Sequence, residues 1–145
     1  MFLLIRSKGE QDMIEGGCRC GAIRYEAEGE HAHHALCHCR DCQMAAGAPV
    51  VAWLAMPNTG FLITQGVPVR YTAPSGATRM FCGNCGTPLF FVNEEVLPGI
   101  VDIQSVTLDA PESVAVQAQI QTADRRSYME TLDNLPSFTR YPGGE

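Results

Sequence analysis

Short runs of apolar residues, separated by glycine, proline and asparagine, dominate the chain from residue 22 onward. Residues 22–27 alternate apolar residues with charged or aromatic ones, and residues 50–54 form a more continuous apolar run. Both patterns are typical of β-strands. Six further runs have a similar character, at residues 61–64, 69–72, 78–81, 89–92, 100–103 and 114–120. The pattern predicts many short strands joined by tight turns.

Helical signals are few and short. A turn of helix is predicted over residues 40–46, and a second helix over residues 125–132 near the end of the chain. Many short strands with little helix indicate a mainly β fold, either a small β-sandwich or a partly open barrel of short antiparallel strands. No internal repeat or low-complexity linker divides residues 13–145, so we expect one domain there.

The first twelve residues differ from the rest. An apolar tip, residues 1–5, is followed by polar residues without periodicity, and we interpret residues 1–12 as an N-terminal extension, with Met13 as a candidate natural start. The tip is too short for a signal-peptide core, and no apolar run approaches the roughly 20 residues that span a bilayer. We therefore expect a cytoplasmic protein without a membrane partner, in a reducing compartment where cysteines do not form structural disulfides.

Composition and charge indicate a folded domain and argue against some classes of partner. Hydrophobic residues make up 46% of the chain and charged residues 18%, which is ordinary for a folded domain. The net charge is −6, and the longest basic run is the pair Arg125 and Arg126, so a nucleic-acid partner is not expected. An anionic substrate would have to meet local arginines. Arg40, Arg70 and Arg79 lie nearest the cysteine motifs in sequence, and we expect each to be a solvated surface residue.

The seven cysteines fall into three groups: Cys18 with Cys20, Cys37 with Cys39 and Cys42, and Cys82 with Cys85. Such clustering within glycine-rich turns is typical of metal ligands and is a poor choice for core packing. A redox C-x-x-C pair would need a βαβ context, which the sequence around the third group lacks.

Cys82 and Cys85 lie in a zinc-knuckle type of hairpin, which needs two further ligands to complete a tetrahedron. Cys18 and Cys20 are the candidates for these ligands. We predict that the four thiolates hold one structural zinc ion, which ties the beginning of the domain to its middle.

The middle group offers Cys37, Cys39 and Cys42 within six residues. Three protein ligands with an open fourth position are typical of a catalytic or substrate-binding zinc. Three thiolates overcompensate the charge of Zn²⁺, so binding of a fourth sulfur from a small thiol is favoured over activation of water. The alternative is that a nearby His or Asp41 closes a second, purely structural site.

Several polar residues surround this group. His38 lies between two ligand cysteines and is expected to support them without binding the ion. His31, His33 and His34 are interpreted as part of a solvent-exposed loop, although such a tract can bind metal. Asp41 is expected to cap the following helical turn, with an acid-base role as the alternative.

Three motifs, in this order, resemble the glutathione-dependent formaldehyde-activating enzyme family, whose domain centromere protein V shares. The motifs are residues 16–25, 37–42 and 81–89, and the resemblance extends over about residues 14–142, including the ending at 133–136 and 141–142.

The resemblance implies a mainly β fold around a four-cysteine structural zinc and a second, catalytic zinc at the middle cysteines. It also implies carbon–sulfur lyase activity, with a small thiol such as glutathione as partner and S-hydroxymethylglutathione as the adduct made or cleaved. Two alternatives remain beside it. One is a non-catalytic interaction module with two structural metal sites, and the other is a redox sensor whose middle group is empty.

Overall fold

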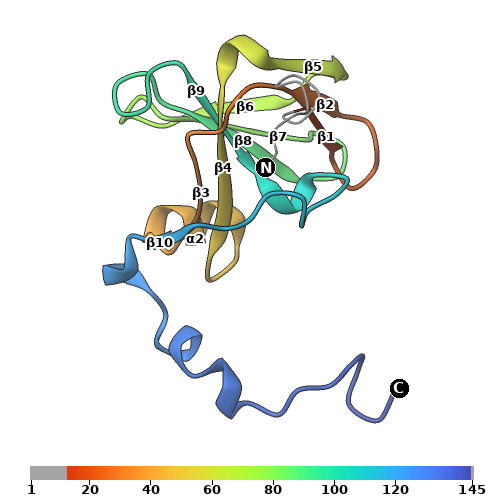
Figure 1. The fold of residues 1–145 in the computed structure, drawn as a ribbon, viewed down its shortest axis with the longest axis vertical. Helices are drawn as coiled ribbons and strands as arrows, with labels where there is room; N and C mark the ends of the chain where they lie inside the picture. The colour runs from red at the N-terminus through yellow and green to blue at the C-terminus, as the bar shows by residue number, and fades with distance from the viewer. Residues whose placement is uncertain (1–12, 145) are drawn as a thin grey trace, which may run out of the picture.

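Two β-sheets form the body of the protein in the computed structural model, which describes residues 13–144 (Figure 1). The smaller sheet has the order β1-β2-β5, with strands Ile14–Gly17, Arg24–Ala27 and Phe61–Gln65. The larger sheet has the order β10-β3-β4-β9-β8-β7-β6. Its strands are β3 (His33–Cys37), β4 (Val51–Pro57), β6 (Val69–Thr72), β7 (Thr78–Phe81), β8 (Pro88–Val92), β9 (Ile100–Gln104) and β10 (Ala118–Ile120). Neighbouring strands are antiparallel except β10, which runs parallel to β3.

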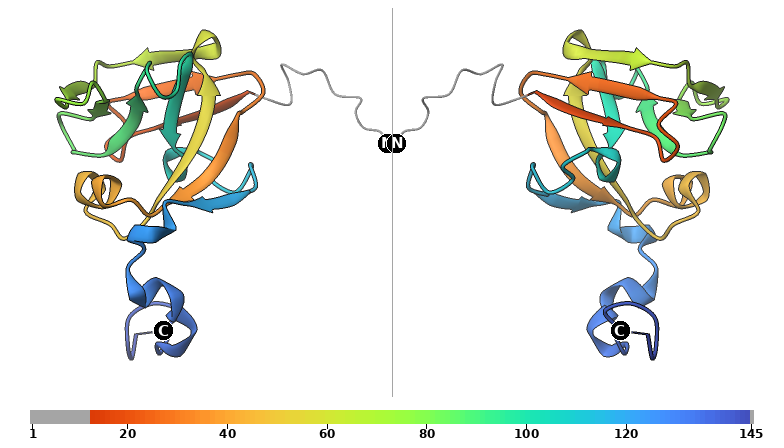
Figure 2. Two further views of the ribbon diagram at one scale, coloured as in Figure 1. Left: turned by 90° about the vertical axis from the view of Figure 1, so that its left-hand side faces the viewer. Right: turned by 90° about the vertical axis from the view of Figure 1, so that its right-hand side faces the viewer.

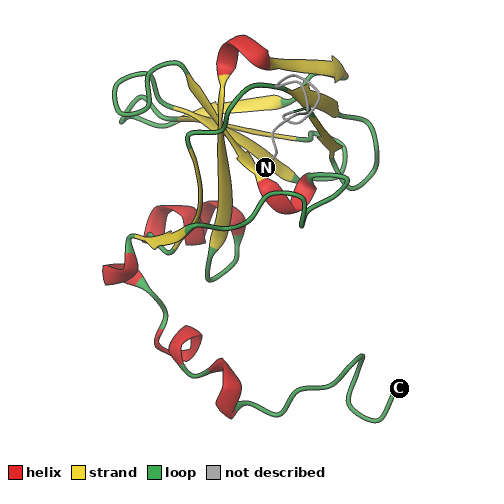
Figure 3. Ribbon diagram, viewed as in Figure 1, coloured by secondary structure: helices red, strands yellow, loops and turns green. Residues whose placement is uncertain are grey.

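Helical structure is sparse beside these strands (Figure 3). The described residues contain one α-helix, α2 (Arg40–Ala46), and short 3-10 turns. The turns are η1 (Asn58–Gly60), η2 (Ser105–Thr107), η3 (Thr122–Asp124), η4 (Ser127–Glu130) and η5 (Leu132–Asn134). No helix in residues 13–144 combines the length and the apolar content that a bilayer crossing would need.

The main core lies between the two sheets. Alternation along β2 buries Tyr25 and Ala27, and these side chains pack with those of the large sheet. The ring of Phe90 lies edge-on to Tyr25 at 5.1 Å and to Phe61 at 4.9 Å between centroids. Alternating apolar residues therefore form strands here because every second side chain enters one shared core.

A glycine is required beneath Tyr25. A side chain at Gly16 would collide with the Tyr25 hydroxyl, which accepts or donates a hydrogen bond with Thr107 at 2.7 Å. The first glycine of the N-terminal motif thus serves core packing.

The outer face of the large sheet carries a second apolar cluster. Cys37, Val51 and Trp53 lie on this face and pack with Cys42 of helix α2, which covers this part of the sheet (Figure 2). The fold thus places α2 and the middle cysteine group on the side of the sheet opposite the main core.

The mainly β prediction is confirmed, and helix α2 has the predicted bounds 40–46. Two strands were missed, β1 and β3. Of the predicted strand over 114–120, only Ala118–Ile120 is a strand, and the predicted helix over 125–132 is replaced by 3-10 turns. The predicted extension over 1–12 lies outside the described residues.

The chain leaves the body after β10. Residues 121–144, which we call the C-terminal arm, are almost entirely exposed and extend away from the two sheets (Figure 1). Several large apolar residues of the arm are about half exposed or more. They are Tyr128, Leu132, Leu135, Phe138 and Tyr141. The arm therefore contributes little to the core.

Candidate metal centres and an adjoining pocket

Four sulfur atoms converge where two turns meet. Cys18 and Cys20 lie in the turn after β1, and Cys82 and Cys85 lie in the turn between β7 and β8. The sulfur of Cys20 is 3.7 Å from that of Cys18 and 3.9 Å from that of Cys82, and all four lie within 4.8 Å of one another. A tetrahedral ion with Zn–S bonds of about 2.3 Å requires sulfurs about 3.8 Å apart. The cluster fits a zinc ion.

Amide groups point at these sulfurs. The Ile23 amide donates to the sulfur of Cys18 at 3.2 Å, and the Asn84 amide donates to that of Cys82 at 3.3 Å. The side-chain amide of Asn84 also donates to Cys20 at 3.2 Å. Such donors offset the negative charge of thiolates and orient them for an ion.

Hydrogen bonds lower the pKa of two of the four thiols. Hydrogen bonding from Thr87 lowers the pKa of Cys85 to about 5. Burial opposes ionisation of Cys18, but hydrogen bonds from the Ile23 amide and neighbouring thiols outweigh it and lower its pKa. Thr87 also accepts a hydrogen bond from the Arg19 amide at 3.0 Å, so one hydroxyl joins both halves of the centre.

The middle group forms a second cluster on the other side of the large sheet. Cys37 ends β3, Cys39 precedes α2 and Cys42 lies in its first turn, and their sulfurs lie within 4.8 Å of one another. The sulfurs of Cys37 and Cys42 are 3.8 Å apart, which also matches a shared tetrahedral ion. The three thiols thus fit a zinc ion that has one open position.

Cys39 caps helix α2. Its sulfur accepts a hydrogen bond from the Cys42 amide at 3.2 Å, at the position usually taken by a Ser or Asp oxygen. The expectation that Asp41 is the cap is therefore wrong. Its carboxylate instead forms an ion pair with Arg79 of β7, at 2.7 Å.

No histidine or carboxylate within residues 13–144 joins this second cluster at ligand spacing. The buried ring of His38 points toward β10, where its Nε2 lies 2.9 Å from the side-chain oxygen of Gln119. The fourth position of the cluster is thus left open by the described residues.

The histidine tract is not an exposed loop, contrary to expectation. His33 and His34 lie in β3, and His34 is buried. Its Nε2 lies 2.7 Å from the Ser105 hydroxyl and its Nδ1 lies 3.1 Å from the Val114 carbonyl. This histidine joins the chain before β10 to the core. His31 is half-buried just before the strand.

Burial sets the ionisation of the second cluster. It raises the pKa of Cys37 to about 12 and also raises the pKa of Cys39. These thiols therefore hold their protons in the absence of an ion, and metal binding must displace them.

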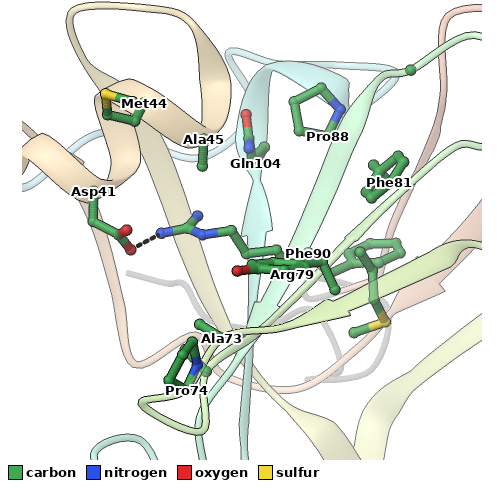
Figure 4. Close-up of a pocket in the computed structure, with 14 residues that line it drawn as sticks. Asp41, Met44, Ala45, Ala73, Pro74, Arg79, Phe81, Pro88, Phe90 and Gln104 are labelled. Atoms are coloured by element: carbon green, nitrogen blue, oxygen red, sulfur yellow. Dashed lines mark hydrogen bonds and ion pairs between the residues drawn. The ribbon is translucent and has the colours of Figure 1, made fainter.

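A cavity of about 620 Å³ lies beside this cluster, between α2, the β6–β7 hairpin and the turn of the first centre (Figure 4). Its lining residues are Asp41, Met44, Ala45, Tyr71, Ala73, Pro74, Ala77, Arg79, Met80, Phe81, Gly86, Pro88, Phe90 and Gln104. The volume suits a small organic ligand.

Arg79 connects the cavity to the cluster. Its guanidinium lies 3.8 Å from the sulfur of Cys42 and over the ring of Phe91, and its side chain is only 17% exposed. The expectation of a solvated surface arginine is wrong for this residue. Alternation along β7 could have placed Arg79 opposite the core residues Thr78 and Met80, but nothing local indicated its cysteine neighbour.

The comparisons with known proteins agree with this architecture. The crystal structure of a Rhodobacter sphaeroides protein, a structural genomics target, has a TM-score of 0.60 and 18% identity. The match covers 73% of this chain and 99% of that chain, and it concerns the fold. A relative from Schizosaccharomyces pombe (strain 972 / ATCC 24843), named an uncharacterized lyase, is 28% identical over 131 residues, which is 83% of this chain and 93% of the relative.

The sequence profile described as glutathione-dependent formaldehyde-activating enzyme matches residues 13–124. This range contains both cysteine clusters and the arginine that lies between the cavity and Cys42. The chain therefore belongs to the glutathione-dependent formaldehyde-activating enzyme family.

Proposed function

We propose that this protein is a zinc-dependent carbon–sulfur lyase that acts on a small thiol adduct such as S-hydroxymethylglutathione. Family membership and the lyase name of the yeast relative support this reaction class. The observation that carries the proposal is a cluster of three thiols with an open fourth position, one side-chain contact away from a ligand-sized cavity. The cytoplasm is the proposed compartment, because reduced thiols are the form that binds zinc.

The two clusters have different proposed roles. Cys18, Cys20, Cys82 and Cys85 would hold a structural ion, because their sulfurs by themselves complete a tetrahedron. The three middle cysteines would hold the second ion, which when bound would lower the pKa of an incoming thiol and so favour the thiolate.

The protein shapes the approach to the second cluster. Cys37 and Cys42 are buried against Trp53, whereas Cys39 is partly exposed. We expect a substrate sulfur to approach from the cavity side, because Arg79 of the cavity wall contacts the sulfur of Cys42 and the other lining residues are mostly apolar.

The proposed reaction balances without an oxidant. In the cleavage direction the carbon–sulfur bond of an S-hydroxymethyl thiol breaks, the hydroxyl loses its proton, and its oxygen forms the carbonyl of formaldehyde. The sulfur leaves with the bonding electron pair as a thiolate and takes up a proton when it is released. The reverse direction adds the thiolate to formaldehyde.

The test uses cobalt-substituted protein, in which ligand changes are visible in the absorption spectrum. Glutathione is expected to change the spectrum of the wild-type protein, and oxidised glutathione, which has no thiol, is not. Cys39→Ser should abolish the response while leaving the helix capped, because serine is a good N-cap residue. Formaldehyde release from S-hydroxymethylglutathione should be lost in the same variant.

A second candidate is a non-catalytic zinc-binding interaction module with two structural ions. The exposed apolar side chains of the C-terminal arm favour it, since such residues are suited to binding another macromolecule. A protein that carries two ions per chain but shows neither a thiol response nor formaldehyde release would exclude the lyase proposal and leave this one.

A further inference from the structure

Arg79 is held from three sides at the edge of the cavity. Its guanidinium stacks on Phe91 with 4.9 Å to the ring centroid, pairs with Asp41 at 2.7 Å and approaches the sulfur of Cys42 at 3.8 Å. In Figure 4 it points between helix α2 and the strands that line the cavity. A charged group fixed in this way is positioned before any ligand arrives.

Part of the guanidinium has no hydrogen-bond partner among residues 13–144. The hydrogen bonds that Arg79 makes with described residues, to Asp41 and to Cys42, both leave from Nη2. Nη1 and Nε make no hydrogen bond within residues 13–144, although the side chain is largely buried. An arginine has five N–H donors, and unused donors at the wall of a cavity can bind an anionic ligand.

The charge and polarity of the cavity lining indicate which kind of ligand it would bind. Arg79 is the one lysine or arginine among the described residues that line the cavity, and most of the others are apolar. The chain as a whole has a charge of −6, so its long-range field repels anions. An anionic group would therefore be bound locally, through charge-assisted hydrogen bonds with this one guanidinium.

We infer that Arg79 is a specificity-determining residue that binds a carboxylate of the substrate while the substrate sulfur lies at the three-cysteine cluster. The placement of the sulfur rests on the proposed function, but the placement of the carboxylate does not. The site then prefers thiols that carry a carboxylate within reach of the sulfur over neutral thiols such as 2-mercaptoethanol. The Asp41 carboxylate holds the Arg79 guanidinium in place through their ion pair, and the substrate carboxylate would bind the other N–H groups of the same guanidinium.

The experiment compares the binding of three ligands to the zinc-loaded full chain by calorimetry. The ligands are glutathione, 2-mercaptoethanol and S-methylglutathione, whose sulfur is blocked. The variants are Arg79→Gln, Arg79→Lys and Arg70→Gln. The last is a matched control, because Arg70 lies on the neighbouring strand β6, outside the cavity lining, and its loss changes the net charge equally.

Arg79→Gln is expected to weaken glutathione and S-methylglutathione binding by about tenfold or more, because a charge-assisted hydrogen bond is lost. Affinity for 2-mercaptoethanol should change by less than about twofold, because this thiol has no carboxylate for Arg79 to bind. Arg79→Lys should restore part of the affinity, and Arg70→Gln should behave as wild type. If Arg79→Gln fails to fold, the lysine variant carries the comparison.

Three results would overturn the inference. One is unchanged glutathione affinity in Arg79→Gln, and another is an equal loss for 2-mercaptoethanol, which would mean that Arg79 acts through Cys42. The third is the absence of any glutathione or S-methylglutathione binding to the wild-type protein. If S-methylglutathione binding depends on Arg79 but no lyase activity is found, the proposed function fails and the inference stands.

Discussion

Asp102 is a buried carboxylate in the middle of the large sheet. Its side chain is 8% exposed, its Oδ1 has no hydrogen-bond partner within residues 13–144, and His33 approaches it at 3.7 Å. Burial raises the pKa of Asp102 to about 6, and the nearby His33 only partly opposes this. An unfolded aspartate ionises near pH 4, so the folded protein binds this proton more tightly than the unfolded chain does.

The sign of the pH effect follows from this difference. Stability from the protonated Asp102 is fully present below about pH 4 and is lost as the pH rises through about 6. Asp102→Asn removes the charge, so it should stabilise the protein by about 1 kcal/mol more at pH 8 than at pH 5. Urea unfolding of both proteins at the two pH values measures this, and an equal effect at both would contradict it.

Backbone hydrogen bonds and a glycine with positive φ shape the two turns of the first centre. The Gly86 amide donates to the Cys82 carbonyl at 2.8 Å, and the Gly21 amide donates to the Cys18 carbonyl at 3.1 Å. Gly86 has φ of 83°, a conformation that glycine adopts without strain. An ion at this centre would add to the Arg19–Thr87 hydrogen bond in linking the turn after β1 to the β7–β8 hairpin.

Cys85→Ser is expected to remove the structural ion and lower the free energy of unfolding by roughly 3 kcal/mol or more, since metal binding and folding are coupled. Cys85 is exposed, so the loss would not come from core packing. Zinc content should fall by one ion per chain, and a chelator that lowers the melting temperature of the wild type should have a smaller further effect. Unchanged stability after loss of that ion would contradict a structural role.

The whole molecule consists of a packed body and an arm. The Rhodobacter sphaeroides structure is matched over 99% of its length by 73% of this chain, so the same fold is complete in a shorter protein. The base of the arm is nevertheless fastened to α2, because the Arg40 amide donates to the Asp124 carboxylate at 3.1 Å and the Gln43 side chain donates to its carbonyl at 3.0 Å.

Deletion of residues 127–145 is therefore expected to change the melting temperature by no more than about 2 °C, because exposed residues away from the core contribute little to stability. The thiol response of the cobalt-substituted protein should also be retained. Thermal unfolding and light scattering of both chains check this. A large loss of stability together with a change in mass would show that the arm is buried against a second copy.

Patterns within short stretches of sequence were enough to predict most strands and the cysteine groups. Short apolar or alternating runs bounded by turn residues predicted eight of the strands in some form, because burial in a sheet leaves a signal within a few residues. The close spacing of the cysteines within each group indicated metal ligands for a similar reason, since a metal-binding turn needs its thiols close together. Strand β3 was not predicted because His33 and His34 interrupt the apolar pattern.

Contacts between side chains far apart in the chain could be found only from the fold. The partners of His34 lie 71 and 80 residues away, and Arg79 lies 38 residues from Asp41. Contacts of this kind depend on strand order and register, which are set by the packing of the whole chain and leave no trace in a short window. Local sequence was therefore enough to predict the cysteine groups, helix α2 and most strands, whereas the cavity and the position of Arg79 at its wall depend on how distant segments pack.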